Sequence, residues 1–230
     1  MKKMIKNACA VAVMAASFAT MAESTDMRVI GAISPAACTP NLSGNGTVDY
    51  GTIAANGLSA DDYNGLPAKE ISLTIACTAP AKVALSAISG RKGSALVYYD
   101  REGAAGSGNG FMRAGAPSYS GFVGFGLDGE KRIGAYALSY SNVTLDGKVA
   151  NVTSSFDKTA WTKSNNNSIY DNNGKIKFDT WYTGEEAIPS SFETMSATVN
   201  VYSYLNKSSE LDISKPIKLD GLTTLELVYL

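Results

Sequence analysis

The stretch Ile71-Ser72-Leu73-Thr74-Ile75-Ala76-Cys77 decides the fold class. Large apolar side chains alternate in it with small or polar ones, which is the period of a β-strand that has one face on a core and one in water. No window of the chain shows a long amphipathic helix. Further alternating segments are found at 29–33, 47–53, 83–87, 122–127, 133–140, 175–178, 197–205 and 222–230. The pattern therefore predicts an all-β protein.

Turn signals separate these segments. Asp128-Gly129 and Asp146-Gly147 are typical of two-residue hairpin turns, and Asp171-Asn172-Asn173-Gly174 is predicted to join 169–170 to 175–176. The stretches 91–120 and 146–174 are rich in Gly, Ser and Asn, so they are interpreted as long loop insertions. The whole predicts a single all-β sandwich enlarged by these insertions, because a minimal immunoglobulin-like sandwich needs only about 100 residues.

The first 22 residues have the three parts of a secretory signal peptide. Lys2, Lys3 and Lys6 precede an apolar run from Ala8 to Phe18, and small residues end at Ala22. The apolar run is too short to span a bilayer core of about 30 Å, so we expect cleavage after Ala22 and not a membrane anchor. Cleavage removes three Lys and no acidic residue from the 20 basic and 21 acidic side chains, which leaves 17 and 21 and a net charge of −4. We therefore expect an exported protein.

Composition argues against several classes of function. The 230 residues contain no His, so there is no imidazole base, no Ser-His or Cys-His pair and no His metal ligand. Charged residues make up only 18% of the chain and its formal net charge is −1, which argues against a nucleic-acid partner, because such a partner would require a basic face. A carboxylate hydrolase remains as an alternative, but the acidic pairs Glu185-Glu186 and Asp61-Asp62 are adjacent, and on a strand adjacent side chains point to opposite faces. The sequence predicts no enzymatic activity and no cofactor.

The cysteine count predicts one disulfide. Cys9 leaves with the signal peptide, and Cys38 and Cys77 remain, separated by 39 residues. An even pair in an exported protein is typical of a disulfide bond, with two free thiols as the alternative. A zinc site is less favoured, because two Cys without His cannot fill a tetrahedral shell.

Both ends of the mature chain resemble the subunits of chaperone–usher pili. Gly31-Ala32-Ile33-Ser34-Pro35-Ala36-Ala37-Cys38 looks like the pilin segment in which a Gly lies seven residues before the first Cys. Thr47-Val48-Asp49-Tyr50-Gly51-Thr52-Ile53 resembles the next pilin strand, and residues 71–77 resemble the strand that carries the second Cys. The last stretch, 225–230, has a penultimate Tyr, as pilins do. The resemblance covers about residues 23–90 and 197–230.

The resemblance implies an immunoglobulin-like sandwich that lacks its last strand and is completed by a donor strand from another molecule. Its domains would be the signal peptide 1–22, a donor-strand extension 23–30 and a pilin-type domain 31–230. Met27, Val29 and Gly31 share one parity and would point into a neighbour's groove. An ordinary first strand within the same domain is the alternative for Met27 and Val29. Only about eight residues would precede Gly31, so a minor or terminal subunit remains open beside a major one.

The implied acceptor is the last strand. Leu225, Leu227 and Tyr229 share a parity and would line the groove, and the family pattern places the docking site of the chaperone at this strand and the Leu230 carboxylate. The implied partners are a periplasmic chaperone, an outer-membrane usher and neighbouring subunits. The implied location is the cell surface, reached through the periplasm, and the implied role is a fimbrial subunit in cell adhesion.

The alternative function is a free-standing secreted sandwich that binds a glycan or another surface ligand. Trp161, Trp181 and Tyr182 are the side chains that could stack on a sugar. A buried or half-buried sheet aromatic is the commoner fate of such residues.

Overall fold

A computed structural model describes residues 24–33, 36–97, 106–107 and 110–230. The chain divides into two units, Met1–Ser34 and Pro35–Leu230, and each is described by itself. The expected signal peptide and Glu23 lie outside the described residues. Residues 24–33 form neither strand nor helix, so the strand expected at 29–33 is not present, because none of these residues has a ladder partner in the described chain.

Strands are the main regular secondary structure of the second unit. Its long strands have the bounds β1 Cys38–Leu42, β3 Lys69–Ala81, β4 Val83–Ser89, β6 Gly121–Gly124, β9 Gly134–Leu145, β11 Asn151–Ser155, β13 Phe178–Tyr182, β14 Phe192–Leu205 and β15 Thr223–Tyr229. Its two-residue strands are β2 Asn64–Gly65, β5 Gly106–Ser107, β7 Leu127–Asp128, β8 Lys131–Arg132, β10 Lys148–Val149 and β12 Thr162–Lys163. Its helical turns are η1 Ser43–Gly46, η2 Ala55–Gly57, α1 Phe111–Ala114 and η3 Ser208–Glu210.

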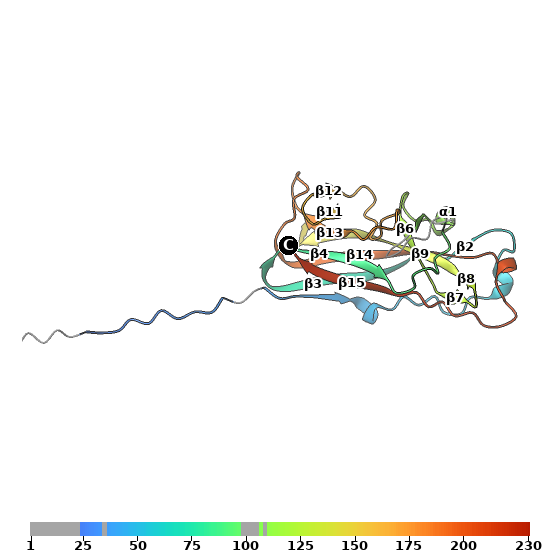
Figure 1. Cartoon of the computed structure of the whole chain (residues 1–230), viewed down its shortest axis with the longest axis horizontal. Helices are drawn as coiled ribbons and strands as arrows, with labels where there is room; N and C mark the ends of the chain where they lie inside the picture. Colours follow the sequence, from blue (N-terminus) through green and yellow to red (C-terminus); the bar gives the residue numbers. More distant parts are fainter. Residues whose placement is uncertain (1–23, 34–35, 98–105, 108–109) are drawn as a thin grey trace, which may run out of the picture. The chain divides into compact units, whose positions relative to one another are not determined.

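Two antiparallel sheets form a sandwich, which confirms the predicted all-β class. One sheet has the order β1-β3-β14-β9-β6-β5, with β2 paired to β14 and β10 to β9. The other has the order β12-β11-β13-β4-β15, and β7 and β8 form a separate hairpin. Figure 1 shows the long strands of both sheets running in nearly the same direction. Aligned sheets of this kind are typical of immunoglobulin-like sandwiches.

The main core lies between the two sheets. The alternating stretch at 71–77 is the middle of β3, and Ile71, Leu73 and Ile75 are buried in this core. Val83 and Leu85 of β4 meet them from the second sheet. Full burial of side chains of this size stabilises the fold by about 1.5–3 kcal/mol each.

The two insertions are more structured than loops. The second contributes β10, β11 and β12 and widens the five-stranded sheet beyond β13. The first supplies Ala95, Val97 and Ala114 to a smaller apolar cluster around Phe122 and Tyr204. Residues 98–105 and 108–109 of the first insertion lie outside the described residues.

The predicted turns are mostly present. Asp146 and Gly147 join β9 to β10, and both have positive φ, as a tight hairpin turn requires. The hairpin at Asp128-Gly129 is shifted by one residue, because Asp128 ends β7 and pairs with Lys131. The turn at 171–174 is closed by the Gly174 N–H, which donates to the Asp171 carbonyl at 3.2 Å, but the residues on either side form no hairpin.

The expected strand at 47–53 is absent, which corrects the sequence prediction. Gly51 has a φ of 63°, and its N–H donates to the Asp49 carboxylate at 2.7 Å. This local turn bends the chain out of the extended conformation that a ladder needs. Val48 and Ile53 still pack against the main core.

Candidate functional site: a groove beside the free edge of β15

The last strand has one unpaired edge. β15 ends the five-stranded sheet and pairs with β4 alone among the described residues. At its two ends the Leu230 N–H donates to the Lys82 carbonyl at 3.0 Å and the Gly90 N–H donates to the Leu222 carbonyl at 2.8 Å. Antiparallel ladders alternate, so the even-numbered positions of β15 are those bonded to β4. Thr223, Leu225 and Leu227 therefore direct their backbone N–H and C=O groups away from β4.

An apolar groove of about 880 Å³ lies beside this edge. One wall is formed by residues 46–55 and Leu58, which follow β1, and the other by Thr223 and Leu225 of β15. Ile71, Val199 and Val201 of the first sheet contribute to its lining. A groove bounded by unpaired backbone groups is suited to an added strand, which would bond to the edge and bury its apolar side chains.

The segment between β14 and β15 borders one end of the groove. Leu211 is buried, and Ile217 and Leu219 pack against the main core. Lys215 forms an ion pair with Asp128 at 3.1 Å, and Arg91 forms one with Asp220 at 2.7 Å. These contacts hold the segment on both sides of its apolar residues.

Two tyrosines meet the first residue of β15. The Tyr170 hydroxyl donates to Thr223 Oγ1 at 2.9 Å, and the Tyr136 hydroxyl shares a hydrogen bond of 2.8 Å with the same atom. Burial raises the pKa of Tyr136 to about 12, and the hydrogen bond to Thr223 opposes part of that rise. Tyr136 also lines the groove, so an uncharged phenol ring forms part of the groove surface near Thr223.

The structure brings together the predicted residues of the last strand and the disulfide. Cys38 and Cys77 are bonded and lie directly opposite each other on β1 and β3, which confirms the predicted pair. Leu225 and Leu227 are half-buried against the main core. Of the three residues predicted to line the groove, Leu225 does so, whereas Leu227 and Tyr229 are not among the lining residues. Tyr229 is 51% exposed, and its hydroxyl accepts a hydrogen bond from the Cys38 N–H at 2.7 Å.

The predicted donor residues lie in the first unit. Met27 is 90% exposed and Val29 is 91% exposed, and a Cβ placed on Gly31 would meet no atom within 4 Å. Leu230, at the other end of the chain, is 43% exposed. Sequence reasoning missed Tyr136, Tyr170 and Thr223, because each looks like an ordinary member of an alternating or polar stretch until the strands are paired.

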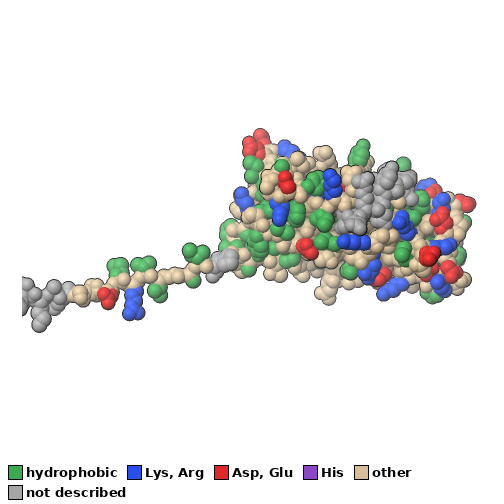
Figure 2. All heavy atoms as spheres, in the orientation of Figure 1, with side chains coloured by type: hydrophobic (Ala, Val, Ile, Leu, Met, Phe, Trp, Pro, Cys, Tyr) green, Lys and Arg blue, Asp and Glu red, His purple; other side chains and the backbone are tan. Residues whose placement is uncertain are grey.

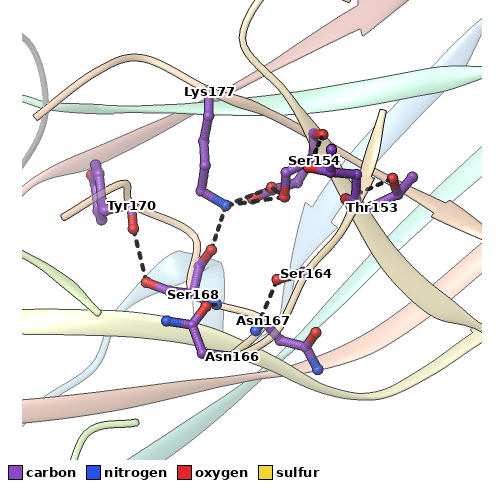
Figure 3. Close-up of polar contacts among 10 residues, drawn as sticks. Thr153, Ser154, Ser164, Asn166, Asn167, Ser168, Tyr170 and Lys177 are labelled. Atoms are coloured by element: carbon purple, nitrogen blue, oxygen red, sulfur yellow. Dashed lines mark hydrogen bonds and ion pairs between the residues drawn. The ribbon is translucent and has the colours of Figure 1, made fainter. Parts of the chain in front are cut away.

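A buried polar cluster surrounds Lys177 (Figure 3). Lys177 Nζ donates to Asp179 Oδ1 at 2.6 Å and to the Ser168 carbonyl at 2.5 Å. Ser154 Oγ donates to the same Asp179 oxygen at 2.6 Å. Burial raises the pKa of Asp179, and the Lys177 ammonium opposes part of that rise. Every charge in the cluster has a partner, so we interpret it as a structural element of the widened sheet.

The aromatic residues considered for glycan binding and the acidic residues considered for a hydrolase do not come together in a common site. Trp181 is fully buried and packs edge-on against Tyr140 and Phe192, so its ring cannot stack on a sugar, and Tyr182 is buried as well. Trp161 is half-buried. Glu185 and Glu186 are exposed in a bend.

The described part of the chain contains neither a group of three or more possible metal-binding side chains nor a helix long and apolar enough to cross a membrane. On the face of the second unit seen in Figure 2, acidic and basic side chains are interspersed. A surface of mixed charge does not favour a polyanionic ligand.

The fold and the groove define a β-sandwich with an open sheet edge. The family model described as "Protein of unknown function (DUF1120)" matches residues 27–137. The chain is 33% identical to "Protein GltF" of Escherichia coli (strain K12) over 106 residues, which are 43% of this chain and 42% of that protein. It is 26% identical over 226 residues to "Uncharacterized protein YhcF" of the same strain, with 90% of each chain covered. The chain thus aligns with less than half the length of the first relative and most of the second. No solved structure matches the chain.

Proposed function

We propose that this protein is a structural subunit of a chaperone–usher fimbria that is assembled by donor-strand complementation and exchange and contributes to cell adhesion. The observation that carries the proposal is the unpaired edge of β15 beside an apolar groove of about 880 Å³. An exposed edge with apolar side chains beside it invites pairing with another chain. In a secreted subunit that must form polymers, such pairing is the function.

The same chain carries a segment with the properties of the missing strand. Met27, Val29 and Ile33 are exposed and share one parity, and Gly31 occupies the position of that parity between Val29 and Ile33. Such a segment buries three apolar side chains when it adds to an edge, and its backbone bonds to the free groups of β15. Residues 24–33 thus supply a donor, and β15 with its groove supplies an acceptor.

The remaining features agree with this role. The signal-like first 22 residues and the Cys38–Cys77 disulfide are typical of a protein that passes through the periplasm. A periplasmic chaperone would cover the β15 edge before assembly, and an outer-membrane usher would then exchange it for the donor segment of a neighbouring subunit. The expected destination is the cell surface.

Assembly tests the proposal. The full chain, with an affinity tag inserted between Ala104 and Ala105, is purified from the periplasm of its own host, and the masses of the species obtained are measured. We expect a one-to-one complex with a chaperone and a ladder of subunit multiples. Val29→Asp places a charge on the groove-facing side of the donor and is expected to remove the ladder while the chaperone complex remains.

Ile30→Asp is the matched control, because Ile30 is as exposed as Val29 but has the opposite parity. It is expected to leave the ladder in place. A folded monomer that binds no chaperone and forms no ladder would contradict the proposed function. A chaperone complex without a ladder in the unmodified chain would indicate a terminal subunit.

A further inference from the structure

The outward faces of the proposed donor and acceptor carry the opposite charges of Arg28 and Glu226, and Asp26 shares the outward parity of Arg28. Arg28 is the basic residue of the segment 24–33, and it has the opposite parity to Met27 and Val29. Glu226 is exposed and has the opposite parity to the half-buried Leu225 and Leu227. Neither Arg28 nor Glu226 forms an ion pair with the residues that the structure describes. Both charges are thus available to a partner.

We propose that the occupant of the groove is residues 24–33 of a second copy of this chain, antiparallel to β15, in the register that sets Arg28 opposite Glu226. This inference rests on the proposed function and names the partner and its register. In this register Met27 lies opposite Leu227 and Val29 lies opposite Leu225. Residues opposite each other in an antiparallel pair point to the same face, so both donor side chains turn toward the core.

The backbone groups agree with this register. Leu225 and Leu227 direct their N–H and C=O groups to the open side, so Val29 and Met27 would exchange both hydrogen bonds with them. Arg28 and Glu226 then form a pair without backbone hydrogen bonds between its two residues, where opposite Cα atoms approach to about 4.5 Å and side chains are closest. Opposite charges at such a position are favourable.

Gly31 supports the register independently of the charges. It falls opposite Thr223, whose hydroxyl is bonded to Tyr136 and Tyr170. The Tyr136 ring is close to the backbone here, since a Cβ on Gly221 would lie 2.8 Å from its Cε1 atom. A donor residue without a side chain lets the donor backbone approach this part of the groove, which the Tyr136 ring and Thr223 line. Ile33 then lies opposite Gly221 and reaches the apolar lining of Ile213, Ile217 and Leu219.

Registers shifted by two residues fit less well. One shift places the apolar Val29 opposite Thr223, whose hydroxyl is bonded to Tyr136 and Tyr170, and moves Arg28 from Glu226 to the uncharged Thr224. The other shift places Gly31, which has no side chain, opposite Leu225, so Leu225 gains no apolar contact from the donor. The same shift places Arg28 opposite Val228. The register with Arg28 opposite Glu226 pairs the two opposite charges and places Met27 and Val29 opposite leucines.

Disulfide trapping in the full chain tests the register while leaving Arg28 and Glu226 in place. The variant Ile30→Cys with Thr224→Cys is expected to yield a ladder linked by disulfides between subunits, because the proposed register sets residues 30 and 224 opposite each other. Ile30→Cys with Leu222→Cys and Ile30→Cys with Val228→Cys are the matched controls for a shifted and a parallel strand. Nonreducing electrophoresis and mass spectrometry of the linked peptides identify the pair that forms.

Charge exchange provides the second measurement. Arg28→Glu and Glu226→Arg are each expected to lower the yield of assembled subunits by about two- to fivefold, since exposed ion pairs are individually weak, and the double variant is expected to recover it. Stronger linkage of residue 30 to residue 222 or 228, or no recovery in the double variant, would overturn the register. A ladder whose donor peptide comes from another protein would contradict the proposal that the donor strand belongs to a second copy of this chain. Absence of any ladder in the unmodified chain would instead contradict the proposed function.

Discussion

Replacing Lys177 with Met is expected to lower the free energy of unfolding by about 3–5 kcal/mol, because it leaves the Asp179 carboxylate buried without its counter-charge. Asp179 is 1% exposed, and Lys177 Nζ is 2.6 Å from its Oδ1 atom. Ser154 would remain as a hydrogen-bond donor, but a hydroxyl does not replace a full positive charge in a buried site. Urea denaturation of the unmodified chain and the variant at pH 7 measures the difference.

The loss should depend on pH in a defined direction. Without Lys177 the pKa of Asp179, which burial already raises, moves further upward. A raised pKa in the folded state gives a contribution to stability that is complete below the unfolded value near 3.9 and is lost as the pH rises through the folded value. The variant should therefore lie closest to the unmodified chain at low pH and fall behind as the pH rises toward 7.

Two controls separate the buried charge from other effects. Lys177→Met with Asp179→Leu removes both charges and is expected to recover much of the stability. Lys163→Met removes an exposed Lys of the same sheet and should change little. A loss of less than about 1 kcal/mol in Lys177→Met at pH 7 would show that the carboxylate is not buried as described.

Replacing Cys77 with Ser is expected to lower the free energy of unfolding by about 3–4 kcal/mol, since the disulfide closes a loop with a sequence separation of 39. β1 lies at the edge of its sheet and pairs only with β3 in the described chain. The disulfide is therefore a major link between β1 and the rest of the sheet. Residues 46–55 and Leu58, which follow β1, form a wall of the groove. Loss of the bond should therefore also reduce assembly.

The double variant Cys38→Ser with Cys77→Ser should lose about as much stability as the single variant, because either change removes the same bond. Thermal unfolding of the unmodified chain with and without a reductant gives a third comparison. Equal melting temperatures for the unmodified and single-variant chains would contradict a stabilising role of the disulfide.

The strands could be predicted where a single face is buried. Residues 71–77 alternate strictly, and the structure buries Ile71, Leu73 and Ile75 on one side of β3. The segment 47–53 alternates as well but forms no strand, since the local bond between Gly51 and Asp49 bends it. Alternation reports which side chains can be buried together and not whether the backbone finds a ladder partner.

The groove depends on pairings that the sequence pattern does not contain. Leu225 and Leu227 could be assigned to one face from their spacing, but the unpaired edge of β15 follows from the order of strands in the sheet. The contacts of Thr223 with Tyr136 and Tyr170 span 87 and 53 residues. The pair Lys177 and Asp179 did carry a local signal, because residues two apart in an extended segment lie on the same face, and Lys177 directly precedes β13.

The most direct test of the open edge is amide hydrogen exchange at single residues of β15, measured by NMR on the full chain with Val29→Asp, the variant expected not to assemble, with and without a synthetic peptide of the unmodified residues 24–33. We expect the amides of Leu225 and Leu227 to exchange rapidly in the free chain and those of Thr224 and Glu226 to be protected by β4. With the peptide at 100 times its dissociation constant, exchange at Leu225 and Leu227 should slow by about a hundredfold. Equal protection of all four amides in the free chain, or no change with the peptide, would contradict an edge that awaits a donor strand.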